Sequence, residues 1–211
     1  MQIDRIFFYG DSYCASSDEG SFPWILEQKG HQVMRLGKRG SGPVELFSFL
    51  QDHNALYDPL INDFAVIMYS AYDRQLDKSG FSMPNVNSID DISDPFISKD
   101  YINALRNYYK HLFNEQQWMN IFKAHVLATR QQCADLGLPY IEYCCFKNEA
   151  DLIGHKFNLH DWCQQGQDLS DDEDDFDKIK NYHNHMSPIQ NQEFAEKIII
   201  DLTEKYRGER V

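Results

Sequence analysis

The sequence predicts an α/β fold, in the form of a three-layer α/β/α sandwich with a central parallel sheet. Nearly continuous apolar runs at residues 6–9, 63–69 and 139–146 predict strands that are covered on both faces. Segments with helical spacing of their apolar residues separate these runs, as in parallel sheets joined by crossover helices. The 211 residues suit one domain, and 42% hydrophobic residues are enough for a packed core.

The first part of the chain alternates between strands and helices. Ser21 opens a helix that has a proline in its first turn and that Gly30 ends. Residues 31–36 alternate in part and predict a second strand. Three glycines mark residues 37–43 as a loop, and helical spacing of apolar residues predicts the next helix over residues 44–55.

The second half of the chain adds helices and two insertions to the expected single domain. Residues 75–100 have little periodicity and predict an insertion, either a lid or binding loop or a plain surface segment. Residues 101–136 predict two helices that break near Asn114. Residues 147–180 predict a second, polar insertion, and the serine, proline and glutamine within residues 187–190 predict the start of the last helix.

The composition argues against several classes of partner. A formal net charge of −13 disfavours nucleic-acid backbones, which require clustered Lys and Arg, and it disfavours anionic membrane surfaces. Residues 168–177 hold seven of the acidic residues. This run lacks the central glycine and the ligand alternation of a calcium-binding loop, so we expect a solvated acidic loop.

Cysteine usage and the length of the apolar runs indicate the compartment. Five cysteines, with no pair at CxxC spacing, argue against a disulfide framework or a structural zinc site, and we expect no metal and no cofactor. No basic leader precedes the first apolar run, and no run approaches the roughly 20 residues that span a bilayer. We therefore expect a cytoplasmic protein that does not bind membranes.

Polar residues gather where the predicted strands end. Ser12 follows the first strand in a Gly-Asp-Ser turn, at the sheet edge where open α/β sheets bind their ligands, and is a candidate nucleophile. The alternative is a plain strand-turn-helix in which Asp11 or Ser12 caps the helix. Residues 70–74 follow the strand at residues 63–69 at the same edge. His185 lies in the loop before the last helix and can project toward that edge.

This ordered set of segments resembles the SGNH, or GDSL-type, hydrolase family. Residues 8–12 match its first block, residues 39–42 its glycine block and residues 185–188 its last block. The resemblance implies the SGNH-hydrolase or flavodoxin-like version of the three-layer fold. It also implies hydrolysis of esters, thioesters or acetyl groups.

The resemblance implies a role for each matched residue. Ser12 would be the nucleophile and His185 the base that takes its proton, with His183 as a competitor that lacks the matching spacing to the last helix. The amides of Ser12 and of one glycine in the second block, either Gly40 or Gly42, would hold the oxyanion.

The sequence departs from the family at two positions. Tyr72 stands where the third block carries an Asn that donates to the oxyanion, and Tyr182 stands where the last block carries an Asp. The spacing from Ser70 to Arg74 is similar to a variant found in phage-type and other divergent members. The candidate assisting residues are polar side chains near the site: Asp11, Ser70, Asp73, Arg74 and Asp177.

Functions from different classes remain open. The first is a serine hydrolase of the SGNH type that cleaves an ester or acetyl ester bond of a small-molecule or carbohydrate-linked substrate. The second is a catalytically weak or inactive module of the same fold that binds a carbohydrate or other small ligand through Tyr72 and Tyr182. A phosphate binder of the flavodoxin type is a third interpretation, but residues 10–16 lack the run of Gly, Ser and Thr that it requires.

Overall fold

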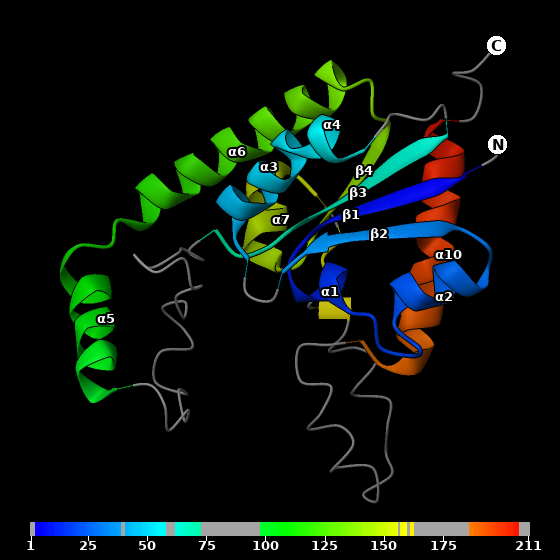
Figure 1. The fold of residues 1–211 in the computed structure, drawn as a ribbon. Helices are drawn as coiled ribbons and strands as arrows, with labels where there is room; N and C mark the ends of the chain where they lie inside the picture. Colours follow the sequence, from blue (N-terminus) through cyan, green and yellow to red (C-terminus); the bar gives the residue numbers. More distant parts are fainter. Residues whose placement is uncertain are drawn as a thin grey trace, which may run out of the picture.

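A four-stranded parallel sheet forms the centre of the protein in a computed structural model (Figure 1). The structure describes residues 3–38, 41–57, 62–72, 98–155, 157–159, 161–162 and 186–206. The strands lie in the order β2-β1-β3-β4, and all neighbours are parallel. Each strand occurs where the sequence predicts one, with bounds Arg5–Gly10 for β1, Gln32–Gly37 for β2, Asp63–Tyr69 for β3 and Tyr140–Cys144 for β4.

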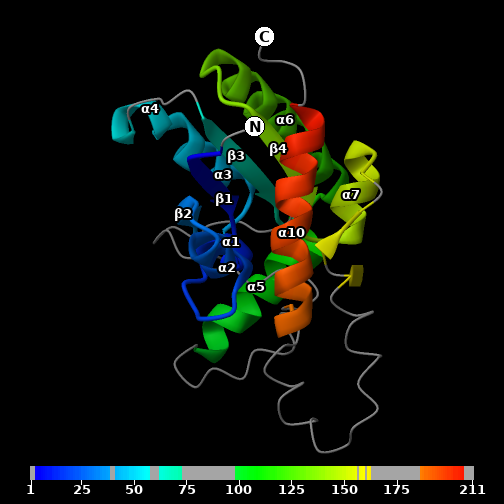
Figure 2. The ribbon, with the colours of Figure 1, turned by 90° about the vertical axis from the view of Figure 1, so that its right-hand side faces the viewer.

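Helices cover both faces of this sheet (Figure 1, Figure 2). α2 and α10 pack together on one face, and α3 and α6 pack together on the other. These layers confirm the predicted three-layer α/β/α fold class. In chain order the helices are α1 (Ser12–Ala15), α2 (Phe22–Gln28), α3 (Pro43–Gln51), α4 (His53–Leu56), α5 (Lys99–His111), α6 (Glu115–Asp135), α7 (Lys147–Ile153) and α10 (Pro188–Lys205).

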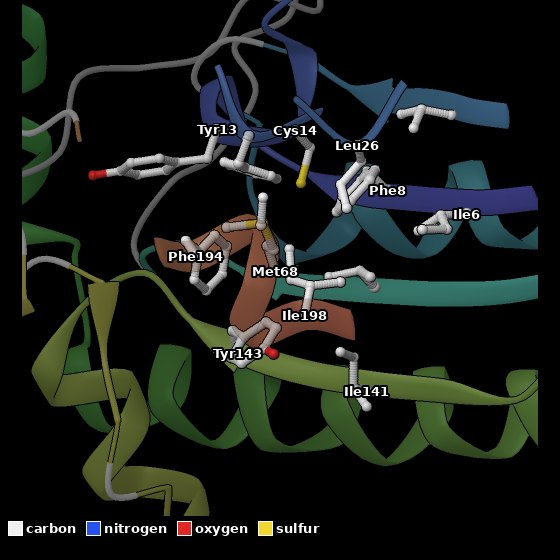
Figure 3. Packing of buried hydrophobic residues seen from close by; sticks show 14 of the residues in the cluster. Ile6, Phe8, Tyr13, Cys14, Leu26, Met68, Ile141, Tyr143, Phe194 and Ile198 are labelled. Carbon is white, nitrogen blue, oxygen red and sulfur yellow. The ribbon is translucent and has the colours of Figure 1, made fainter. Parts of the chain in front are cut away.

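Alternation along β1 divides the core into two clusters. Ile6 and Phe8 lie in the cluster shared with α2 and α10, which Figure 3 shows from close by. Phe7 and Tyr9 lie in the second cluster, with α3 and α6. All four side chains are fully buried. The continuous apolar run of β1 therefore follows from its cover on both faces.

Local capping chemistry places the predicted helix boundaries. Asn114 accepts a hydrogen bond from the Gln117 N–H at the start of α6, which confirms the predicted break in residues 101–136. Ser187 and Gln190 form the predicted capping box at the start of α10.

Two local predictions differ from the structure. The helix predicted over residues 44–55 is two helices, α3 and α4, which meet at Asp52. β4 ends at Cys144, and the polar insertion predicted over residues 147–180 begins with α7 instead of a loop. α7 packs on the second core cluster through the buried Ala150 and the partly buried Leu152 and Ile153, but its seven residues are too few to show a helical period in the sequence.

Several predicted segments lie largely outside the described residues. The acidic run at residues 168–177 is one of them. Of the insertion predicted at residues 75–100, the structure describes residues 98–100, where Ser98 caps α5.

The described residues also include four cysteines and several long helices. Cys14, Cys133, Cys144 and Cys145 are free thiols and are fully buried, so they pack as small apolar residues. Within the described ranges, no helix combines the length and the apolar character that crossing a bilayer requires.

Two glycines let α1 approach the sheet closely. Gly10 and Gly37 are register partners at the carboxyl ends of β1 and β2. A Cβ on Gly37 would lie 2.6 Å from the Asp11 carbonyl oxygen and 2.6 Å from Cys14 Cβ, and a Cβ on Gly10 would lie 2.8 Å from Cys14 Sγ. These separations are shorter than van der Waals contact, so a larger residue would push α1 away from the sheet.

We expect Gly37→Ala to lower the free energy of unfolding by about 1–3 kcal/mol, because the backbone of α1 must move. Urea unfolding followed by circular dichroism measures the change. Ser48→Ala introduces the same side chain at an exposed position of α3 and should cost less than about 0.5 kcal/mol. Equal stability of Gly37→Ala and the wild type would contradict the close contact between α1 and β2.

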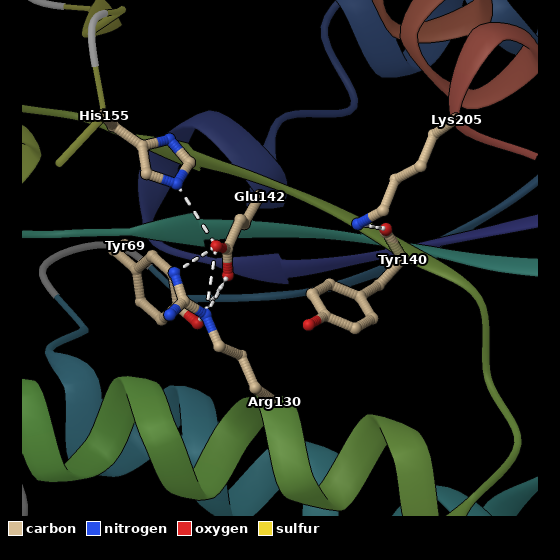
Figure 4. Close-up of polar contacts among 6 residues, drawn as sticks. All are labelled: Tyr69, Arg130, Tyr140, Glu142, His155 and Lys205. Atoms are coloured by element: carbon tan, nitrogen blue, oxygen red, sulfur yellow. Dashed lines mark hydrogen bonds and ion pairs between the residues drawn. The ribbon is translucent and has the colours of Figure 1, made fainter. Parts of the chain in front are cut away.

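A charged cluster ties β4 to its neighbours (Figure 4). Glu142 accepts hydrogen bonds from Arg130 of α6, from His155 Nε2 at 3.2 Å and from the Tyr69 hydroxyl at 3.3 Å. Burial alone would raise the pKa of Glu142. The hydrogen bonds from His155 and Arg130, together with their positive charge, outweigh burial and lower the pKa of Glu142 to about 2.

This shift predicts how acid affects stability. Because the pKa of Glu142 falls below its ordinary value of 4.5 on folding, its ionisation stabilises the fold above about pH 4.5, and that contribution is lost as the pH falls toward 2. Between about pH 6 and pH 3 we expect the wild type to lose about 2 kcal/mol more stability than Glu142→Gln. Urea titrations at each pH measure this difference.

A matched control separates Glu142 from the general effect of acid. Glu204→Gln removes an exposed carboxylate of α10 and should keep the pH dependence of the wild type. If Glu142→Gln loses as much stability as the wild type over the same pH range, the cluster does not hold β4 through an ionised carboxylate.

Candidate functional site

The sheet order creates a switch point between β1 and β3. From β1 the chain passes to β2 on one side and then returns to β3 on the other side of β1. Ligand sites of open α/β sheets lie outside the carboxyl ends of the strands at such a point. Asp11 and Ser12 follow β1 there, and Ser70 follows β3. The structure thus brings these predicted site residues to one edge.

The carboxylate of Asp11 joins the ends of three strands. It accepts hydrogen bonds from the Tyr13 N–H at 3.1 Å and from the Ser70 hydroxyl at 3.0 Å, and the Cys145 thiol donates to it at 3.9 Å. Asp11 is fully buried, where a carboxylate requires such donors. Asp11 therefore caps α1 and fixes the strand ends, which confirms the capping alternative for this residue.

Ser12 is the partly exposed residue of this turn. It is the first residue of α1, and Asp11 and Cys14 on either side of it are fully buried. Burial raises the pKa of the Cys14 thiol well above its ordinary value, and the charge of Asp11 raises it further. Cys14 therefore stays protonated and is a poor nucleophile.

The loop after β2 is anchored on the end of β1. The Lys38 N–H and the Ser41 hydroxyl both donate to the carbonyl oxygen of Gly10, at 3.2 Å and 2.6 Å. The Ser41 N–H also donates to the Lys38 carbonyl at 3.0 Å. These two loop residues therefore lie beside the turn that carries Ser12, and Gly40 stands between them in the sequence.

Glu45 distinguishes between the two glycine candidates for the oxyanion hole. The Gly42 amide donates to the Glu45 carboxylate at 3.3 Å in the first turn of α3. The same carboxylate accepts from Lys38 Nζ at 3.2 Å. An amide bonded within the start of a helix is not available to an oxyanion, so Gly42 is disfavoured and Gly40 remains the candidate.

The third family block carries an Asn that donates to the oxyanion, and this chain has Tyr72 at that position and Ser70 two residues before it. Both hydroxyls donate to carboxylates of the protein. The Ser70 hydroxyl gives its single proton to Asp11. The Tyr72 hydroxyl donates to Glu115 at 2.6 Å, and the Tyr72 N–H donates to Glu149 at 2.9 Å. In this arrangement neither Ser70 nor Tyr72 presents its hydroxyl proton to an oxyanion.

The start of α10 is fixed beside α2. Asn191 Nδ2 donates to the Met186 carbonyl at 3.1 Å, and Asn191 Oδ1 accepts from the Phe22 N–H at 2.8 Å. Met186 is buried in the same core cluster as Tyr13, which follows Ser12 in the chain. α10 therefore begins on the side of the sheet that carries α1.

The remaining candidate residues lie outside the described residues, and their roles stay predictions. They are Gly40, Asp73, Arg74, Asp177 and His185, together with His183 and Tyr182.

Four residues of this edge were not predicted from the sequence: Ser41, Glu45, Cys145 and Glu149. The spacing from Gly42 to Glu45 is that of a capping box and could have pointed to Glu45. The sequence carries no signal for the other three, because each bonds to a segment that is distant along the chain.

Neither a protein-family model nor a curated protein matches this sequence. Among solved structures, AlinE4, an SGNH-hydrolase family esterase, is 11% identical over 97% of this chain and 97% of its own, with a TM-score of 0.42. A protein assigned to the lipolytic G-D-S-L family from Desulfitobacterium hafniense DCB-2 is 13% identical over 78% of this chain and 73% of that chain, with a TM-score of 0.39. The likeness is to SGNH/GDSL-type folds.

We expect Asp11→Ala to lower the free energy of unfolding by about 2–4 kcal/mol, because it removes the cap of α1 and the acceptor of the buried Ser70 hydroxyl. Asp11→Asn keeps an oxygen for the Tyr13 N–H and should cost less. Asp18→Ala, which truncates an exposed aspartate in the next loop, is the control. Urea unfolding measures both variants. If Asp11→Ala loses no more free energy of unfolding than Asp18→Ala, the Asp11 carboxylate does not hold the strand ends together.

Proposed function

We propose that this protein is a serine hydrolase of the SGNH/GDSL type that cleaves an ester or acetyl ester bond of a small-molecule or carbohydrate-linked substrate. The observation that carries the proposal is the position of Ser12. This partly exposed serine directly follows the central strand β1 at the switch point of a parallel sheet. Its neighbour Asp11 is held by Ser70 and Cys145, which supports a fixed geometry for the turn.

In the proposed mechanism, His185 takes the proton of the Ser12 hydroxyl while the serine oxygen attacks the carbonyl carbon of the ester. The tetrahedral intermediate then collapses, the bond to the alcohol oxygen breaks, and His185 returns its proton to the leaving alcohol. A water molecule, deprotonated by the same histidine, then attacks the acyl carbon. The bond between that carbon and Ser12 Oγ breaks, His185 returns the proton to Ser12 Oγ, and the acid is released. The anchored position of Met186 on the α1 side of the sheet supports this pairing.

The amides of Ser12 and Gly40 would hold the oxyanion. The two hydrogen bonds from Lys38 and Ser41 to the Gly10 carbonyl support this role for Gly40, because they fix both neighbours of the segment that contains it. One such donor typically contributes about 10²–10³ in rate.

Two supporting groups of the family pattern need substitutes in this chain. With the hydroxyls of Ser70 and Tyr72 engaged, Arg74 is the remaining candidate for the third oxyanion donor. Asp177 is the candidate for the acid that orients His185, a role that is worth up to about 10⁴ in rate.

A second function is favoured by the engagement of Ser70 and Tyr72. If no other group replaces the missing donor, turnover falls by about 10²–10³ and binding remains. The chain would then act as a weak or inactive module of the same fold that holds a carbohydrate or other small ligand.

A fluorophosphonate probe and p-nitrophenyl acetate test the proposal. We expect the probe to react at Ser12, whose oxygen displaces fluoride from phosphorus, and we expect Ser12→Ala to lose both labelling and turnover. His185→Ala should lower turnover by about 10²–10⁴-fold, the usual contribution of a general base. Ser16→Ala removes another partly exposed serine just beyond α1 and should behave as the wild type.

Circular dichroism verifies that each variant is folded. Equal labelling and equal turnover in the wild type and in folded Ser12→Ala would overturn the hydrolase proposal. A wild type that resists the probe but binds a small ligand would instead support the second function.

A further inference from the structure

A hollow of about 460 Å³ lies beyond the carboxyl end of β3. Tyr72 after β3, Met119 on α6 and Leu152 on α7 supply its apolar surface. Its volume falls within the range of small-ligand sites. Tyr72 stands two residues after Ser70, whose hydroxyl donates to Asp11, but the described lining of the hollow includes neither Asp11 nor Ser12.

Tyr72 is held both at its backbone and at the tip of its ring. The backbone N–H donates to Glu149 at 2.9 Å, and the ring hydroxyl donates to Glu115 at 2.6 Å. The side chain is partly buried and packs against the core cluster of α3 and α6, while it also lines the hollow. An aromatic ring that is fixed in advance loses little freedom when a ligand stacks on it.

Polar side chains of both charges line the hollow together with this ring. Glu115 and Asp151 supply carboxylates, Lys123 supplies an ammonium group, and Asn148 supplies an amide that donates and accepts. Two negative charges against one positive charge disfavour an anionic ligand. A wholly apolar ligand is also disfavoured, because it would cover these polar groups without bonding to them.

We infer that the hollow binds a neutral pyranose ring of a carbohydrate. The C–H face of the sugar stacks on the Tyr72 ring. The sugar hydroxyls, each of which donates and accepts, bond with Asp151, Asn148 and Lys123 around it. A neutral sugar uses both an aromatic face and mixed donors and acceptors, and it carries no charge of its own.

This inference deepens the proposed function, because it locates the carbohydrate part of the substrate or ligand. It does not require Ser12 to react. If the probe does not label Ser12, the hydrolase proposal fails and the sugar site is unaffected. If no sugar binds, the sugar site fails and the hydrolase proposal is unaffected.

Methyl NMR of the full chain, labelled at its methionine methyl groups, tests the inference. The probes are the neutral disaccharides lactose, maltose and cellobiose, with glucose 6-phosphate as the anionic comparison. We expect at least one disaccharide to shift the Met119 methyl saturably, while the Met34 methyl of β2 stays in place. The sugar phosphate should bind more weakly.

Variants of Tyr72 provide the decisive comparison. Tyr72→Ala should weaken binding about tenfold, and Tyr72→Phe should stay within a few-fold of the wild type because it keeps the ring. Tyr140→Ala removes a tyrosine that is also partly buried, at the amino end of β4 and outside the lining of the hollow, and should bind as the wild type. Ser12→Ala should also bind sugar as the wild type.

Two results would overturn the inference. The first is the absence of a saturable Met119 shift with every disaccharide at concentrations up to about 20 mM, which would mean a dissociation constant above that value. The second is equal affinity in the wild type and in folded Tyr72→Ala.

Discussion

Three strand ends converge on one buried carboxylate, that of Asp11. The turn after β1 supplies it, Ser70 after β3 and Cys145 after β4 donate to it, and the first turn of α1 adds the Tyr13 N–H. Burying a carboxylate is costly, so the stability of this turn depends on all of these donors together. The carboxyl edge of the sheet is therefore one connected unit, and whatever chemistry occurs there takes place on a framework set by this residue.

Structural and accessible groups alternate along the same short turn. The Gly10 carbonyl receives the loop after β2, Asp11 points inward to cap α1, and Ser12 is the partly exposed residue between buried neighbours. The close packing of α1 against Gly37 fixes the position of the turn, and with it which of these residues are buried and which is exposed. A serine in this place is held by its surroundings without being buried by them, which is the condition that a nucleophile requires.

Most of the architecture could be predicted from the sequence because the strands are buried on both faces and the long helices carry clear caps. β1 and β3 stand out as continuous apolar runs, and Asn114 and Ser187 mark helix starts through local hydrogen bonds. α7 could not be predicted because its seven residues make too short a segment for a helical period to stand out, although Ala150, Leu152 and Ile153 all contact the core.

The candidate site was less predictable than the fold, for a physical reason. Ser12 follows from a local motif, whereas the partners that shape its edge act across the chain: Cys145 on Asp11, Ser41 on Gly10 and Glu149 on Tyr72. Such contacts leave no periodicity in the sequence. The finding that Ser70 gives its proton to Asp11, which removes it as an oxyanion donor, depends on the three-dimensional arrangement alone.

The hydrogen bond from the Phe22 N–H to Asn191 joins the start of α2 to α10. During synthesis on the ribosome, Ser12 and its turn emerge long before α10 exists. One wall of the core beneath α1 stays open throughout that interval, since Phe194 and Ile198 close it only after α10 forms. The nascent chain therefore carries a nearly finished sheet whose face toward α10 stays uncovered until that helix forms.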